Sequence, residues 1–211
     1  PLLAYQSKKK LDAGLRLPRM AFYAEAIVLQ VALLLLGIFV ARREDIVLFR
    51  PAADGYGTVV ISIAVLALAL ALMLVFVRFS GPKTLERLAM LVPGTQREQF
   101  VWVAVSAAAA MGEEVVYRGV MVTLLERSLG SWWIAVAISA SAFGLAHIVQ
   151  GWKNVAFIVV FAVVFHLLVR STGSLAPAVV VHFLYDVITG FILGKRLAPR
   201  PDEQSSNEPD M

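Results

Sequence analysis

Long apolar segments, separated by short polar connections, run along most of this chain. Such runs are the strongest sequence signal for bilayer-spanning helices, because about 20 helical residues cross a hydrocarbon core of about 30 Å. The segments cover approximately residues 21–41, 59–77, 99–125, 131–149, 152–169 and 174–193. The pattern therefore predicts an all-α fold, a polytopic transmembrane helix bundle with about six spans.

The composition supports the same class. Of the 211 residues, 59% are hydrophobic and 16% are charged, whereas soluble domains are about a quarter charged. A soluble core of this size could not bury so much apolar surface, and a disordered chain would be far more polar. The chain contains no cysteine, which excludes disulfides, thiolate metal ligands and cysteine catalysis. The net charge of +4 is typical of basic cytoplasmic loops and does not call for nucleic acid as a partner.

Lysine and arginine are more frequent in the loops that share a side with both ends of the chain. This bias predicts that both termini are cytoplasmic. We expect the membrane to be a bacterial cytoplasmic membrane. We divide the chain into an N-terminal segment with two helices (1–98), a core of four helices (99–194) and a disordered polar tail (195–211). The chain begins at Pro1 rather than Met, so a further N-terminal helix can be missing. Turns are predicted at Gly130-Ser131 and Gly173-Ser174.

The third apolar segment carries charges within the hydrocarbon. Its uncharged part, 100–112, would rise only about 20 Å, so the spanning helix must include Glu113, Glu114 and Arg118. A charge there costs at least about 2.5–3.5 kcal/mol, so such residues face the bundle interior. Glu114 and Arg118 are i,i+4 and can form a buried structural pair. Glu113 points about 100° away on the stripe of Tyr117, which favours a functional role.

The three histidines also lie in apolar segments. His182 and Asp186 are i,i+4, so they could be two ligands of one ion, or Asp186 could orient the histidine ring. His147 lies near the cytoplasmic end of its helix, so a site shared with Glu113 should open in that direction. His166 has no acid at helical spacing, and we interpret it as a packing residue.

A carboxylate, two imidazoles and a second carboxylate in a low-dielectric cavity are suited to activating water. The histidines could bind a divalent metal, or donate hydrogen bonds to an oxyanion without one. Either arrangement would hydrolyse an amide within the membrane. Two other interpretations remain open: a proton- or metal-coupled transporter, and a non-catalytic membrane partner protein that keeps these residues as a polar core.

Three motifs occur in order on separate predicted helices. Glu113-Glu114-Val-Val-Tyr-Arg118 resembles the EExxxR motif of the CPBP family, which comprises CAAX proteases and bacteriocin-processing enzymes and is also called Abi. Phe143-Gly-Leu-Ala-His147 resembles the family's FxxxH motif. His182-Phe-Leu-Tyr-Asp186 resembles its HxxxN/D motif, with Asp where the CAAX endopeptidases have Asn. The resemblance covers about residues 99–193.

The resemblance implies an intramembrane metalloendopeptidase related to the type II CAAX prenyl endopeptidase. Its partners would be membrane lipid and a membrane-associated protein or peptide substrate, CAAX-type or lipid-modified. Glu113 would activate water, and His147 would bind that water or a metal. His182 and Asp186 would complete an oxyanion or metal site.

The resemblance also implies supporting roles and a cofactor. The supporting motif residues would be Glu114, Arg118, Phe143 and Tyr117. A divalent metal, zinc by family analogy, would bind His147, His182 and Asp186, with a metal-free glutamate mechanism as the alternative. Some family members serve in bacteriocin immunity or as scaffolds, which keeps the non-catalytic interpretation open. The sequence makes no prediction of oligomeric state.

Overall fold

The computed structural model describes residues 19–52 and 54–197, which form a bundle of helices. Its elements are α2 (Arg19–Arg43), α3 (Gly55–Arg78), α4 (Pro82–Leu91), α5 (Gln96–Glu113), the π-helix η1 (Glu114–Met121), α6 (Val122–Leu129), α7 (Trp132–Ala146), the 3₁₀ turn η2 (Ile148–Gln150), α8 (Trp152–Thr172) and α9 (Ala176–Leu197). The segments α5, η1 and α6 form one continuous helical rod of 34 residues. The predicted all-α fold is confirmed.

Within the described residues, five helices are long and apolar enough to cross a membrane, namely α2, α3, the α5–η1–α6 rod, α8 and α9. The remaining predicted span, 131–149, is only partly helical. Its helix α7 has 15 residues and would rise only about 22 Å. It ends because His147 leaves the helical conformation, and the chain then turns through η2 to Gly151, whose φ is +97°. This correction matters for function, because it places His147 at a helix end.

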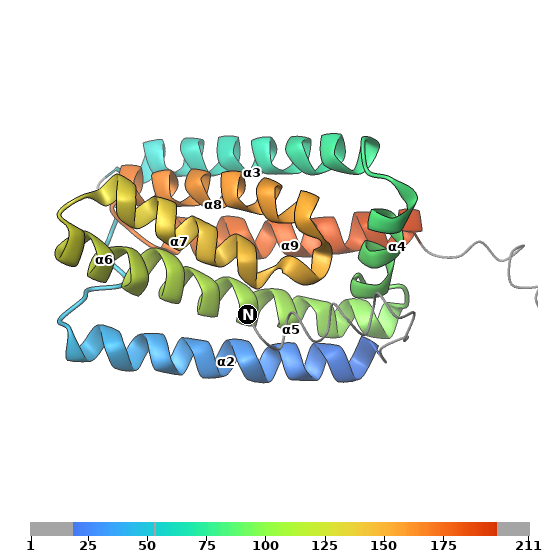
Figure 1. Cartoon of the computed structure of the whole chain (residues 1–211), viewed down its shortest axis with the longest axis horizontal. Helices are drawn as coiled ribbons and strands as arrows, with labels where there is room; N and C mark the ends of the chain where they lie inside the picture. The colour runs from blue at the N-terminus through green and yellow to red at the C-terminus, as the bar shows by residue number, and fades with distance from the viewer. Residues whose placement is uncertain (1–18, 53, 198–211) are drawn as a thin grey trace, which may run out of the picture.

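The long helices lie side by side, and α4 lies across one end of the bundle (Figure 1). The α5–η1–α6 rod is central: α5 packs against α2 and α9, and η1 and α6 pack against α7. On the other side, α3 and α8 pack against α9. Phe165, Leu168 and Val181, each no more than 2% exposed, form a core between α8 and α9. The bundle thereby surrounds the charged rod with apolar helices.

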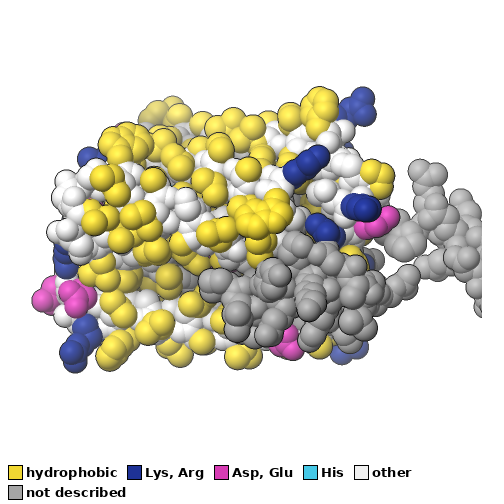
Figure 2. All heavy atoms as spheres, in the orientation of Figure 1, with side chains coloured by type: hydrophobic (Ala, Val, Ile, Leu, Met, Phe, Trp, Pro, Cys, Tyr) yellow, Lys and Arg dark blue, Asp and Glu magenta, His cyan; other side chains and the backbone are white. Residues whose placement is uncertain are grey.

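The flank of the bundle is apolar. Large hydrophobic side chains such as Val28, Leu35, Ile63 and Trp133 are more than half exposed. On the face shown in Figure 2, apolar side chains cover the length of the bundle and charged side chains gather towards its ends. An apolar flank bounded by charged ends is the surface that a bilayer requires. The chain is therefore an integral multi-pass membrane protein.

The predicted turns are confirmed. Gly130 and Gly173 end α6 and α8 in the left-handed conformation, with φ of +68° and +67°, which glycine adopts without steric cost. The Ser131 hydroxyl caps α7 by accepting a hydrogen bond from the Ile134 amide. The cytoplasmic location of the termini stays a prediction. Part of its basis, Lys8–Lys10 and Arg16, and most of the predicted tail lie outside the described residues.

Candidate active site

The rod that carries both glutamates widens into a π-helix directly after Glu113. Short π-helical turns inside α-helices are frequent at functional sites. The wider turn changes the backbone hydrogen bonding. Within this turn, the Tyr117 carbonyl oxygen accepts a hydrogen bond of 2.9 Å from the buried Ser139 hydroxyl of α7. The sequence predicted an ordinary α-helix here, so the π-helix is a correction. Glu114 and Arg118 both lie in this π-helix and are buried within the bundle.

Glu114 and Arg118 form the predicted ion pair, with 3.3 Å between Oε1 and Nη1. Both side chains are at most 1% exposed. The guanidinium carbon lies 4.1 Å from the centre of the Phe143 ring, a cation–π contact. Glu114 has a second contact that the sequence did not predict, because its Oε1 lies 2.8 Å from Nδ1 of His182. The buried pair therefore also orients a histidine of the site.

Glu113 lies between both imidazoles, as the spacing of the motifs suggested. Its Oε1 is 3.9 Å from Nε2 of His147, and its Oε2 is 3.7 Å from Nε2 of His182. The Glu113 side chain is 9% exposed. Its Oε1 also accepts a hydrogen bond of 2.6 Å from Nε2 of Gln30. Three helices and the end of a fourth thus converge on one carboxylate.

Gln30 is the site residue that sequence reasoning missed. It is on α2, and the three motifs all lie in the later part of the chain. A signal was present, because Gln30 and Glu25 are the only strongly polar residues of the first apolar segment. An amide in the middle of such a segment is expected to face a partner.

The conformation of His147 leaves one ring nitrogen, Nε2, available to take part in a reaction. Its Nδ1 lies 2.9 Å from the Phe143 carbonyl oxygen, which can only accept, so Nδ1 carries a proton. In the neutral ring Nε2 is then an acceptor that faces Glu113. The Phe143 ring packs against the His147 ring and edge-on against Tyr117, with centroids 4.6 and 5.1 Å apart. Phe143, itself packed against Tyr117, thus lies against this imidazole.

Asp186 lies on the same face of α9 as His182, but it does not orient the ring through Nδ1. Its Oδ2 is 3.6 Å from Nε2 of His182, whereas Glu114 occupies the Nδ1 side. Glu114 is thus a partner of the His182 ring in addition to Asp186, and the role of Asp186 stays a prediction. The main chain of Asp186 is fixed by Trp102, whose Nε1 donates to the Asp186 carbonyl oxygen at 2.9 Å.

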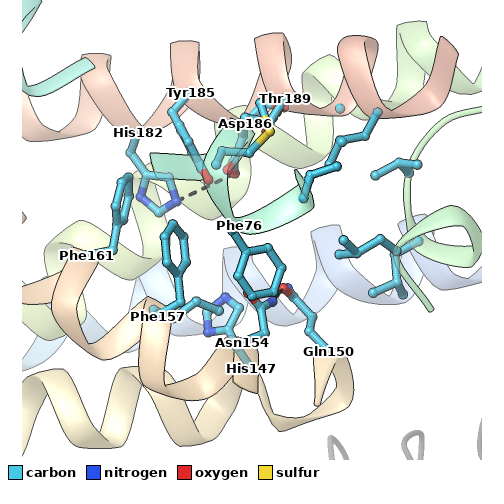
Figure 3. Close-up of a pocket in the computed structure, with 18 of the residues that line it drawn as sticks. Phe76, His147, Gln150, Asn154, Phe157, Phe161, His182, Tyr185, Asp186 and Thr189 are labelled. Carbon is cyan, nitrogen blue, oxygen red and sulfur yellow. Dashed lines mark hydrogen bonds and ion pairs between the residues drawn. The ribbon is translucent and has the colours of Figure 1, made fainter. Parts of the chain in front are cut away.

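A cavity of about 160 Å³ opens beside these groups. Figure 3 shows its two polar walls, one from the end of α7, η2 and the start of α8, the other from α9. The first wall carries His147, Gln150 and Asn154, and the second carries His182, Tyr185, Asp186 and Thr189. Phe76, Phe157 and Phe161 lie between the walls. The cavity is therefore apolar along its length and polar beside His147 and His182, the two histidines that face Glu113.

Further lining residues come from α4 and the segment after it, including Leu88, Leu91 and Val92. The cavity thus lies towards the α4 end of the bundle, which the charge bias predicts to be cytoplasmic. His166 is not among the lining residues. It is 3% exposed on α8, and its Nε2 has no hydrogen-bond partner.

The site has donor types suitable for a divalent metal, namely two imidazoles and a carboxylate. Within 19–52 and 54–197, however, no three His, Asp or Glu residues form a group that could hold a metal ion. Metal binding by His147, His182 and Asp186 stays a prediction.

The fold and site together define a multi-pass membrane protein that buries a glutamate–histidine cluster, consistent with a catalytic site, beside an internal cavity. A family model described as type II CAAX prenyl endopeptidase Rce1-like matches residues 95–188. These residues are a domain of the Rce1-like CAAX prenyl endopeptidase (CPBP) family, whose endopeptidases are intramembrane proteases. The resemblance drawn from the motifs is confirmed. Searches of curated proteins and of solved structures each gave no match.

Proposed function

We propose that this chain is an intramembrane endopeptidase in which Glu113 activates the water that hydrolyses a peptide bond. The observation that carries the proposal is the position of Glu113. Its carboxylate lies within 3.9 Å of the Nε2 atoms of two histidines that line a cavity, in a domain of a protease family.

The first step needs a water molecule held beside a base. Oε1 of Glu113 and Nε2 of His147 are 3.9 Å apart, too far for a direct hydrogen bond but close enough for one water to donate to both. Both atoms are acceptors when the carboxylate is ionised and the imidazole is neutral. As the water oxygen bonds to the substrate carbonyl carbon, Glu113 takes its proton.

The second step stabilises the oxyanion and expels the amine. A proton on Nε2 of His182 would let this ring donate to the oxyanion, while Glu114 holds Nδ1 at 2.8 Å. Glu113 then returns its proton to the amide nitrogen as the C–N bond breaks. The products are a carboxylic acid and an amine, and Glu113 ends as the carboxylate. No step passes through a metal.

The shape and lining of the cavity support a membrane-associated substrate. Phe76, Phe157 and Phe161 line it between the two polar walls, so an apolar side chain or lipid group can occupy the aromatic part. A peptide carbonyl can then reach the polar part near His147. Substrates would be membrane-associated proteins or peptides, CAAX-type or otherwise lipid-modified.

The test is cleavage by purified protein in detergent micelles. The probes are an internally quenched, farnesylated CAAX peptide and a library of membrane-tethered peptides. We expect the wild type to cleave a probe, and Glu113→Gln and His147→Ala to lose at least about 100-fold in rate. His166→Leu is a matched control, because His166 is a buried histidine outside the cavity lining, and it should keep wild-type activity.

Other outcomes would contradict the proposal. Equal cleavage by the wild type and Glu113→Gln would exclude Glu113 as the base. Absence of cleavage by any form, combined with proton or metal flux in liposomes, would identify a transporter. Absence of both activities would favour a non-catalytic membrane partner.

A further inference from the structure

We propose that Gln30 is a positioning residue that fixes the Glu113 carboxylate from outside the family domain. The proposal deepens the proposed function and rests on it. The family match covers 95–188 and assigns nothing to α2. Yet α2 supplies a short contact of the proposed base, the 2.6 Å hydrogen bond from Nε2 of Gln30 to Oε1 of Glu113.

The orientation of the Gln30 amide is set by charge. Its nitrogen faces the carboxylate, and its Oε1 is buried without a hydrogen-bond partner. A reversed amide would place two oxygens against each other, which an ionised carboxylate cannot accept. A buried, unpartnered oxygen is unfavourable for folding. An amide whose oxygen gains nothing, in a helix otherwise rich in Leu, Val and Ala, is better explained by what its nitrogen does for Glu113.

Contacts along the length of α2 fix its position, so Gln30 is held beside Glu113. At the α4 end, Arg19 pairs with Glu98 at 3.3 Å, and the Tyr23 hydroxyl donates to the Leu91 carbonyl oxygen at 2.9 Å. At the other end, a Cβ on Gly37 would lie only 2.7 Å from a methyl carbon of Val115. Tyr23 and Gly37 are buried and lie seven residues before and after Gln30. The three residues share the stripe of α2 that faces the rod.

A glycine makes room for the contact. A Cβ added at Gly112, the residue before Glu113, would lie 2.7 Å from the Gln30 carbonyl oxygen and 2.9 Å from its Oε1. Both distances are shorter than van der Waals contact allows, so Gly112→Ala would push α2 away from Glu113. The absence of a side chain at Gly112 thus permits the hydrogen bond next to it.

The consequence for the reaction is geometric. Gln30 restrains Oε1, the oxygen that faces His147, and this leaves Oε2 directed at His182. A displaced carboxylate could no longer hold a water against the His147 imidazole. A misplacement of about 1 Å in such an arrangement costs on the order of 100-fold in rate. Loss of the Gln30 donor should therefore lower kcat, while KM depends on cavity walls that do not include Gln30.

The experiment uses the full chain and the farnesylated CAAX probe, or the library peptide that the wild type cleaves best. Gln30→Met keeps the volume and removes the donor. We expect kcat to fall about 10- to 100-fold, with KM within about twofold and an unfolding temperature within about 3 °C. Leu34→Met is the matched control, one turn further along the same helix and partly buried like Gln30, and it should retain wild-type kcat.

Gly112→Ala provides a second variant that acts on the same hydrogen bond. It should lower kcat to a similar extent, and the double variant Gln30→Met/Gly112→Ala should be no worse than the poorer single one, because both changes remove one interaction. Wild-type kcat in Gln30→Met would overturn the proposal. So would fully additive losses, or an equal loss in Leu34→Met, since these would mean a general packing role.

A spectroscopic measurement separates this proposal from the proposed function. The infrared difference spectrum between wild type and Gln30→Met should show a shifted carboxylate stretching band. The same difference measured in a Glu113→Gln background should lack that band. This result is expected whether or not the protein cleaves the probes. Identical carboxylate bands in wild type and Gln30→Met would overturn the Gln30 assignment, whereas failure of cleavage alone would overturn only the protease assignment.

Discussion

Replacing Glu114 by alanine should destabilise the bundle strongly, because it leaves a buried charge without its partner. Arg118 is 4% exposed and pairs with Glu114 at 3.3 Å. Removing one member of a buried ion pair costs about 3–5 kcal/mol. The contact of Arg118 with the Phe143 ring does not involve Glu114, so it should not offset the loss. We therefore expect the free energy of unfolding to fall by about 3–5 kcal/mol.

A double variant makes this prediction specific. Glu114→Ala/Arg118→Met removes both charges, and replacement of a whole buried pair by apolar residues is often neutral or stabilising. The double variant should therefore be more stable than Glu114→Ala by at least about 2 kcal/mol. Glu113→Ala is the control, because the closest partner of Glu113 is the neutral amide of Gln30. We expect it to cost less, about 1–3 kcal/mol.

The assay is reversible unfolding by SDS in mixed micelles, followed by the fluorescence of the four tryptophans. A loss below about 1 kcal/mol in Glu114→Ala, or a double variant less stable than the single one, would refute the reasoning. The cleavage rate provides an independent test of the role of Glu114. Glu114 holds His182 through Nδ1, and loss of such an orienting partner typically costs about 10- to 100-fold. Glu114→Gln, which keeps an acceptor oxygen, should retain more activity than Glu114→Ala.

Three further predictions concern neighbouring features. Gly190→Ala would place a Cβ against the indole of Trp102 and displace its hydrogen bond to Asp186. The free energy of unfolding should therefore fall by about 1–3 kcal/mol. Gly55→Ala, which has open space around it, should leave the stability unchanged in the same assay. His166→Leu removes a buried nitrogen that lacks a partner, and SDS unfolding should show unchanged or slightly higher stability. Because the steps proposed for Glu113 use no metal, we expect cleavage to survive chelation; a stoichiometric metal that disappears in His182→Ala, with activity restored by adding the metal, would contradict this.

Much of the fold follows directly from the sequence. Five apolar segments are long membrane-type helices, and the glycine–serine turns are placed as predicted. The early end of α7 was harder to predict from the sequence. The apolar residues Ile148 and Val149 continue the hydrophobic pattern, although the backbone leaves the helical conformation. A periodicity argument cannot detect this, since hydrophobicity records burial and does not record backbone conformation.

The site was predictable in its members but only partly in its contacts. The spacing of Glu114 and Arg118 predicted their ion pair, because both residues lie on one helix. The contacts between Glu114 and His182, and between Gln30 and Glu113, join residues 68 and 83 positions apart. Such contacts depend on how the helices pack and on the π-helix at Glu114–Met121. Neither feature has a local sequence signature that one sequence reveals.

The most direct test of the central claim is cleavage of the probe in ¹⁸O-labelled water, with mass spectrometry of both fragments. If Glu113 delivers water to the carbonyl carbon, the wild type will place one ¹⁸O atom in the new carboxyl terminus at the first turnover. Glu113→Gln will then yield no labelled fragment above background. Equal labelled product from Glu113→Gln, or wild-type product without the label in its new carboxylate, would contradict the account.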